Sequence, residues 1–179
     1  MRRLALLLPL LSAACAAPPA GPPVQTVPVV DLSRYAGDWY EVARYPNRFE
    51  DGAGLDCVDV TASYALRGED RVAVVNRCRN AAAGGAPQEA QGRAYVVEGS
   101  RGAKLRVTFF WPFYGDYWVI GLDPGYRWAV VGAPRRDYLW VLSRTPGLPE
   151  TEYATALEAA RAQGFDLARL KRTPQSAAQ

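Results

Sequence analysis

The chain has 179 residues, of which 49% are hydrophobic, and a net charge of +3, which suits one domain with a substantial core. It contains no histidine, and this excludes Ser-His-Asp and Cys-His nucleophilic catalysis and imidazole ligation of a metal. Its basic residues form no stripe, so no nucleic acid is expected as a partner. Five Trp and ten Tyr, by contrast, suit the wall of a cavity.

The N-terminus predicts an export signal. Met1-Arg2-Arg3 gives a positive start, and the apolar run 4–11 is too short to span a membrane as a helix. Small residues then lead directly into Cys15, which resembles a bacterial lipoprotein signal over residues 1–14. The resemblance implies that Cys15 is lipidated and anchors the protein. Ser12 departs from the usual Leu, and an ordinary secretory signal with an incidental Cys15 stays open.

The next segment, residues 15–29, is rich in Pro and Ala and lacks periodicity, so it predicts an extended tether between anchor and domain. Ala16 after the cysteine resembles lipoproteins directed to the outer membrane, where this protein would sit lipid-anchored on the periplasmic side. The domain itself is expected over residues 30–175, with a short tail at 176–179.

Most of the domain reads as short strands. After a possible helical turn at 31–35, alternation and turn residues predict strands separated by loops, with a flexible Ala/Gly loop at 80–87 and another loop at 111–115. The expected strands are 37–43, 58–66, 71–76, 92–98, 105–109, 116–122, 126–131 and 138–143. Eight short strands joined by tight turns predict a sandwich or an up-and-down barrel.

The pattern changes near the C-terminus. Pro149 suits the first turn of a helix, Tyr153, Leu157 and Ala160 recur at helical spacing, and Gly164 ends the segment. This helix is too short to form a core of its own, so we expect it to pack on the outside of the sheet.

Three motifs in order make the sequence similar to the lipocalin family, and most similar to its bacterial outer-membrane and apolipoprotein-D-like members. Gly37-Asp38-Trp39-Tyr40 matches the G-x-W motif, residues 121–126 match the second region except at Pro124, and residues 138–146 match the third. The resemblance covers about 29–175. It implies an all-β fold: an eight-stranded antiparallel up-and-down barrel with one C-terminal α-helix packed outside.

The resemblance also gives three residues a structural role. In the family, an arginine at the position of Arg144 stacks over the indole ring of the motif tryptophan, here Trp39, which follows Gly37. This contact closes the floor of the barrel, and a desolvated cation–π contact contributes about 1–2 kcal/mol. These residues are therefore not assigned to a ligand.

Candidate ligand-binding residues follow from the same family pattern, because alternate residues of an eight-stranded barrel face its interior. They are Tyr64, Asn76, Phe109, Tyr117, Tyr138, Trp140 and Leu142. Plain core packing is the alternative for each of them. Together they would form an apolar site with a few polar groups.

Cys57 and Cys78 form a candidate disulfide in an oxidising compartment. A two-residue turn at Arg67-Gly68 would place them directly opposite each other, but it conflicts with Tyr64 and Asn76 both facing inward. A β-bulge would remove the conflict by shifting the parity. Two free thiols stay open, and a zinc site is not expected without His or a third ligand.

The expected function is to bind, store or transport a hydrophobic ligand, such as a fatty acid or lysophospholipid, in the bacterial envelope. No catalysis, cofactor or metal is expected, and a homodimer is possible. Two alternatives stay open. A carboxylate-driven enzyme would use Asp56, Asp59 or Glu98, and a structural or partner-binding lipoprotein would have its barrel filled by side chains.

Overall fold

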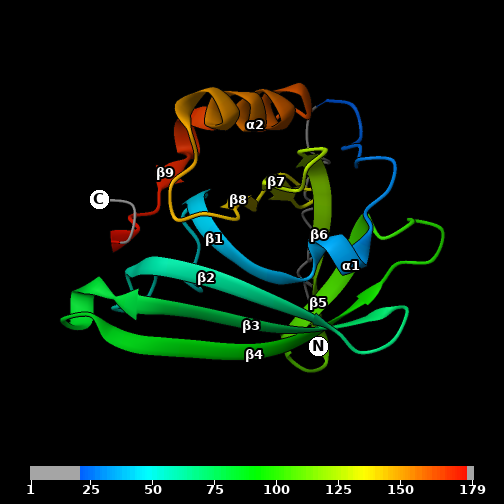
Figure 1. Ribbon diagram of the computed structural model, residues 1–179. Helices are drawn as coiled ribbons and strands as arrows, with labels where there is room; N and C mark the ends of the chain where they lie inside the picture. Colours follow the sequence, from blue (N-terminus) through cyan, green and yellow to red (C-terminus); the bar gives the residue numbers. More distant parts are fainter. Residues whose placement is uncertain (1–20, 177–179) are drawn as a thin grey trace, which may run out of the picture.

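The computed structural model describes residues 21–176, so the expected signal peptide, Cys15 and residues 177–179 of the expected tail lie outside the described residues. The described chain forms a barrel with a helix against its outer wall (Figure 1). The strands are β1 (Gly37–Arg44), β2 (Cys57–Leu66), β3 (Arg71–Asn80), β4 (Ala86–Val96), β5 (Lys104–Phe110), β6 (Phe113–Leu122), β7 (Trp128–Gly132), β8 (Leu139–Ser143) and β9 (Lys171–Arg172). The helices are α1 (Leu32–Tyr35) and α2 (Glu150–Ala162), with 3₁₀ turns at Ala81–Ala83 and Leu167–Arg169.

The sheet closes on itself. Each strand from β1 to β7 pairs antiparallel with the strand that follows it, and β8 pairs with β1 to close the barrel. The short strand β9 pairs with β1. Closure removes the unpaired strand edges that would otherwise attract other chains. The expected eight-stranded antiparallel up-and-down barrel is confirmed, with β9 as an additional strand.

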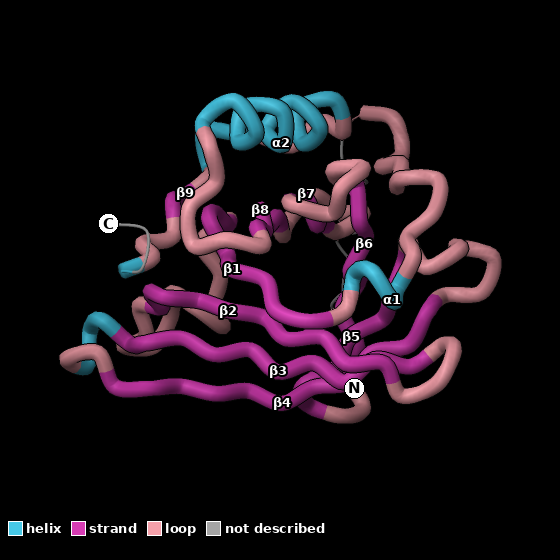
Figure 2. Tube along the Cα trace, viewed as in Figure 1, coloured by secondary structure: helices cyan, strands magenta, loops and turns pink. Residues whose placement is uncertain are grey.

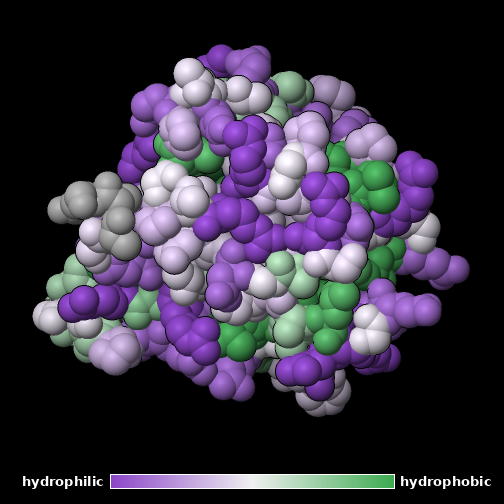
Figure 3. All heavy atoms as spheres, viewed as in Figure 1, coloured by the Kyte–Doolittle hydropathy of each residue, from purple (hydrophilic) through white to green (hydrophobic). Residues whose placement is uncertain are grey.

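Helix α2 covers one side of the barrel, opposite β2, β3 and β4 (Figures 1 and 2). Its buried residues Tyr153, Ala156 and Ala160 pack in one cluster with Val130 and Val141 from the outer side of the sheet. The expected external C-terminal helix is therefore confirmed. Hydrophilic residues cover most of the face seen in Figure 3, over α2 and the barrel wall alike. Within residues 21–176, no helix combines the length and apolar character needed to cross a membrane.

The two ends of the barrel differ. At one end, called here the closed end, α1 covers the interior and Tyr35 packs into an internal cluster with Trp39. The opposite end, called the distal end, carries the loops β1–β2, β3–β4, β5–β6 and β7–β8. The segment before α1 packs along the wall, since Val24 is buried and the Val27 amide donates to the Val119 carbonyl. Part of the expected tether thus lies against the barrel.

Two expected loops are shorter than the sequence suggested. The loop expected at 80–87 covers only residues 81–85, because β3 and β4 pair without interruption from Arg71–Tyr95 to Asn80–Ala86. The side chain of Asn80 accepts from the Ala82 amide and so ends the strand. Strand β6 likewise begins at Phe113, which pairs with Phe110 across a tight hairpin. The Ala/Gly run 81–85 forms the turn, whereas the mostly polar residues 77–80 and 86–91 join the ladder.

The β2–β3 hairpin settles the register conflict. Its turn is longer than the expected two residues, since Leu66 pairs with Val72 and five residues lie between them. Ala62 then pairs with Asn76, and the register shifts between Val58 and Thr61, as the expected bulge requires. The disulfide between Cys57 and Cys78 is confirmed, with an S–S distance of 2.03 Å.

Candidate functional site

The inward side chains of the barrel form two apolar clusters. One contains Val72, Val74, Ala94 and Leu105, and the other contains Trp39, Val119, Ala129, Val131 and Leu142. Tyr64 and Tyr117 pack against both clusters. The interior is therefore one continuous apolar wall that the two tyrosines bridge.

Three tyrosine hydroxyls meet inside the barrel near its closed end. The Tyr35 and Tyr117 hydroxyls lie 2.7 Å apart, and the Tyr117 hydroxyl donates to that of Tyr64 at 2.9 Å. Burial raises the pKa of Tyr35 and Tyr117 well above 10 and that of Tyr64 to about 12. These groups are neutral at physiological pH, and the hydroxyls satisfy one another.

A cavity of about 20 Å³ lies beside these tyrosines. Its lining is almost entirely apolar and comes from α1, β2, β3, β4, β5 and β6: Leu32, Tyr35, Ala36, Tyr64, Leu66, Val72, Ala94, Leu105, Val107 and Tyr117. This volume holds about one water molecule. Side chains therefore fill most of the space at this end of the barrel.

Phe109 and Asn76 contribute to the same interior wall. The Phe109 ring lies over Gly92, where a Cβ atom would come within 2.8 Å of it, so glycine is needed at this position. Asn76 pairs with Ala62 on one side and Ala90 on the other. Its Oδ1 atom is buried and has no hydrogen-bond partner among the described residues. A buried acceptor without a partner is unfavourable, so a bound donor would stabilise it.

Trp140 faces the opposite part of the interior, packing on the internal cluster that contains Trp39, while its neighbour Val141 packs beneath α2. Its ring stacks on Tyr138 at 5.5 Å, and Tyr138 stacks on Phe49 at 6.3 Å. The Trp140 indole Nε1 donates to Glu50 at 3.1 Å. A row of aromatic rings thus leads from the interior to the distal end.

The structure distributes the seven sequence-predicted ligand residues over three places. Tyr64, Asn76, Phe109 and Tyr117 share one side of the interior. Leu142 lies deep in the cluster with Trp39, and Trp140 and Tyr138 continue towards the distal end. The first four are close enough to act together, whereas Leu142 is a buried packing residue.

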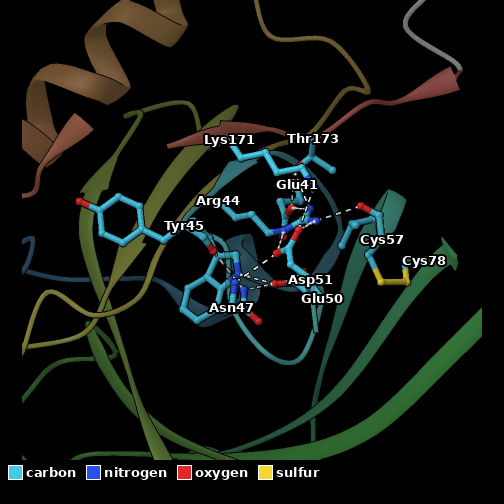
Figure 4. A network of polar contacts seen from close by, with 12 residues as sticks. Glu41, Arg44, Tyr45, Asn47, Glu50, Asp51, Cys57, Cys78, Lys171 and Thr173 are labelled. Carbon is cyan, nitrogen blue, oxygen red and sulfur yellow. Dashed lines mark hydrogen bonds and ion pairs between the residues drawn. A yellow bond between two sulfur atoms is a disulfide. The ribbon is translucent and has the colours of Figure 1, made fainter. Parts of the chain in front are cut away.

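Sequence reasoning missed a buried polar network beside Trp140 (Figure 4). Its centre is Arg44, whose side chain is fully buried. Arg44 donates from Nε and Nη2 to the two oxygens of Asp51, at 2.8 and 2.7 Å, and from Nη1 to Glu41 at 2.8 Å. Lys171 on β9 also donates to Asp51, at 2.8 Å. The network ties the β1–β2 loop and β9 to the end of β1.

The two acids of this network have opposite pKa shifts. Burial, followed by the charge of Glu50, raises the pKa of Glu41 well above its usual value. Burial also acts to raise the pKa of Asp51, but hydrogen bonds from Arg44 and Lys171 outweigh it and hold that pKa well below its usual range. The inward parity that Glu41 shares with Trp39 was a signal for a buried acid, but not for the partners of that acid.

Arg144 and Trp39 close the floor of the barrel. The guanidinium lies 3.8 Å from the centre of the indole ring, and the Trp39 Nε1 donates to the Tyr35 carbonyl at 2.8 Å. Gly37 has a φ of +93°, and a Cβ there would lie 3.4 Å from Arg144. Glycine is therefore favoured here for the backbone conformation, while a Cβ would only touch the arginine.

The acids considered for catalysis do not converge. Asp56 accepts from Lys171, Asp59 accepts from Ser176, and Glu98 lies in the β4–β5 turn at the other end of the barrel. Across the part of the chain that the structure describes, no group of three or more His, Cys, Asp or Glu is placed to hold a metal ion. Asp56, Asp59 and Glu98 are thus not placed together for acid–base work.

Comparisons with known proteins agree with this geometry. A family model described as a lipocalin-like domain matches residues 30–175. The chain is 43% identical over 173 residues to the outer membrane lipoprotein Blc of Escherichia coli K12, covering 91% of this chain and 94% of that protein. It is 33% identical over 135 residues to bovine (Bos taurus) apolipoprotein D, covering 72% and 67%. The solved structure of insecticyanin from Manduca sexta has a TM-score of 0.71 at 21% identity, covering 90% and 89%, and supports the fold.

Proposed function

Because the chain belongs to the lipocalin-like family, we propose that it binds a hydrophobic ligand, of the fatty acid or lysophospholipid class, inside the barrel. The ligand is stored or carried in the bacterial envelope and is not chemically changed. The observation that carries the proposal is the continuous apolar wall bridged by Tyr64 and Tyr117, with Asn76 Oδ1 as its one unpartnered acceptor among the described residues.

The polar atom suits such a lipid. A hydroxyl of a lysophospholipid, or the protonated carboxyl of a fatty acid, can donate a hydrogen bond to Asn76 Oδ1. The rest of the wall offers rings and aliphatic groups to an acyl chain. Small-molecule sites usually combine an apolar lining with few polar groups in this way.

The closed end of the interior has little free space. Ligand sites usually measure roughly 300–1,000 Å³, whereas the cavity beside Tyr64 measures about 20 Å³. An acyl chain that reaches this end must therefore displace inward side chains there, and Tyr35, Tyr64 and Tyr117 are the large ones that line it. This small volume also favours a second candidate function, a structural or partner-binding lipoprotein with a filled barrel.

The relatives named outer membrane lipoprotein Blc support a place for this protein in the outer membrane. We propose that Cys15 carries the lipid anchor and that the domain lies on the periplasmic side. The position of Cys15 directly after an apolar run and small residues supports this proposal. The possible homodimer stays a prediction.

A titration with palmitate or lysophosphatidylcholine, followed by tryptophan fluorescence, tests lipid binding. We expect saturable quenching in the parent and a loss of affinity of at least about tenfold in Trp140→Ala. The matched control is Trp118→Ala, because Trp118 packs on the outer cluster with α2. Absence of any saturable fluorescence change in the parent would contradict lipid binding and favour the structural or partner-binding lipoprotein with a filled barrel.

A further inference from the structure

Three large aromatic side chains stand exposed at one hairpin tip. Phe110, Trp111 and Phe113 are 70%, 72% and 78% exposed, and Phe110 pairs with Phe113 across the β5–β6 turn. Single exposed apolar residues are ordinary, but three within four positions on a protruding turn form a local apolar surface. Such a surface is unfavourable in water and marks a place of contact with another surface.

The tip belongs to the distal end, which carries a further aromatic ring and basic groups. Phe49 in the β1–β2 loop is 51% exposed, and the Arg48 guanidinium lies 4.9 Å from its ring centre. Arg135 in the β7–β8 loop has a side chain that is 77% exposed. Aromatic rings beside arginines are the composition that settles at a membrane interface, and arginine also attracts anionic lipid.

The N-terminal segment begins at the distal end of the barrel. The Pro22 carbonyl accepts from Arg136 in the β7–β8 loop, at the distal end. Eight residues later, Val30 bonds to the carbonyl of Arg101 at the closed end. The described chain therefore starts at the distal end and runs away from it. Cys15 precedes Pro22 by seven positions, and a chain that spans at most about 3.6 Å per residue cannot place them more than about 25 Å apart.

We propose that the aromatic tip Phe110–Phe113 inserts into the surface of a phospholipid bilayer and so docks the barrel with its distal end towards the membrane. A narrow convex tip fits between lipid headgroups, whereas a protein partner of ordinary affinity needs a broad complementary surface. The lipid anchor proposed at Cys15, which the length of the chain confines to about 25 Å from Pro22, would hold the distal end close to the bilayer. Docking uses none of the proposed lumen ligand residues, so it holds or fails independently of the proposed lipid binding.

Vesicle binding tests the docking. The protein carries Cys15→Ser, so that no lipid anchor contributes, and the vesicles contain phosphatidylethanolamine and phosphatidylglycerol. We expect co-sedimentation of the parent and a partition coefficient lower by about tenfold or more in the triple variant Phe110→Ser, Trp111→Ser, Phe113→Ser. The matched control is Val29→Ser, which removes an exposed apolar side chain outside the distal end and should leave partition unchanged. Equal partition of the triple variant and the parent would overturn the proposal.

A second measurement does not depend on how the triple variant folds. Vesicles with bromine on the upper acyl chain should quench part of the tryptophan emission of the parent. The variant Trp111→Phe keeps an apolar tip but should lose that quenching, because the other four tryptophans lie elsewhere. Identical quenching in both proteins would contradict insertion. A tip-dependent dimer without vesicle binding would assign the surface to a second copy of the chain and also overturn the proposal. Palmitate binding, measured in parallel, should be unchanged in the triple variant.

Discussion

The guanidinium of Arg144 lies 3.8 Å from the centre of the Trp39 ring and donates to four backbone carbonyls, those of Arg34, Tyr35, Ala36 and Asp38. One side chain thus joins the end of β8, the start of β1 and α1. The contact holds the cap of the closed end in place and so keeps water from the interior at that end.

Replacing this arginine should weaken the fold. Arg144→Ala removes the cation–π contact and leaves carbonyls without a donor, which together lower the free energy of unfolding by roughly 2–3 kcal/mol. Arg144→Lys keeps the charge but not the planar fork, and should recover less than half of this loss. Urea unfolding measures both. Full recovery by lysine would show that charge alone matters.

The disulfide should stabilise the β2–β3 hairpin. Its cysteines are 21 positions apart, and closing a loop of that size in the unfolded chain contributes about 3 kcal/mol. In the double variant Cys57→Ser, Cys78→Ser the free energy of unfolding should be lower by about that amount, and the protein should unfold at a lower urea concentration. A reductant should lower the stability of the parent and leave the double variant unchanged. An equal response of both proteins would contradict this assignment.

Glu41 should make stability fall as the pH rises. Its pKa is raised in the folded protein, so the folded state holds the proton more tightly than the unfolded chain. Its favourable contribution is complete below the usual value of 4.5 and is lost as the pH climbs towards the raised pKa. Glu41→Gln keeps an acceptor for Arg44 and Thr173 and removes the titration. Melting temperatures between about pH 5 and 8 should therefore vary less in Glu41→Gln than in the parent, while Glu98→Gln, in an exposed turn, should behave as the parent.

Asn76 should lower the stability of the fold and raise the affinity for a lipid ligand. Asn76→Leu removes a buried acceptor without a partner, which should raise the free energy of unfolding by about 1 kcal/mol and lower lysophospholipid affinity. Thr108→Val is the matched control, since Thr108 Oγ1 is also buried without a partner but lies on β5 between the inward positions 107 and 109. We expect it to raise stability alone. Unchanged affinity in Asn76→Leu would remove Asn76 from the ligand site.

The strand pattern and three motifs were enough to predict the barrel, the external helix and the sides of Trp140 and Tyr64, because period-two alternation fixes which face is buried. The lengths of β3 and β4 were not predictable, since residues 77–80 and 86–91 are mostly polar and show no clear alternation, and they pair only because the two strands lie side by side. The two-residue turn was wrong for a related reason: Arg67-Gly68 suits several turn types, and the register of the whole hairpin decides among them.

The Arg44 network was out of reach for a different reason. Its partners come from β1, the following loop and β9, and Lys171 is far from Asp51 in the sequence. A shift in the β1–β8 register between Glu41 and Ala43 interrupts the simple alternation from which sides are read. Pairing over such distances follows from tertiary structure and leaves no local pattern.

We propose, above all, that the barrel takes up one acyl chain against its apolar inner wall. Native mass spectrometry of the protein with palmitate measures this directly. We predict a one-to-one complex in the parent and its loss in Ala94→Phe, which fills the interior beside Tyr64, while Ala94→Gly retains it. A parent that forms no complex, or an Ala94→Phe variant that binds as well as the parent, would contradict the account.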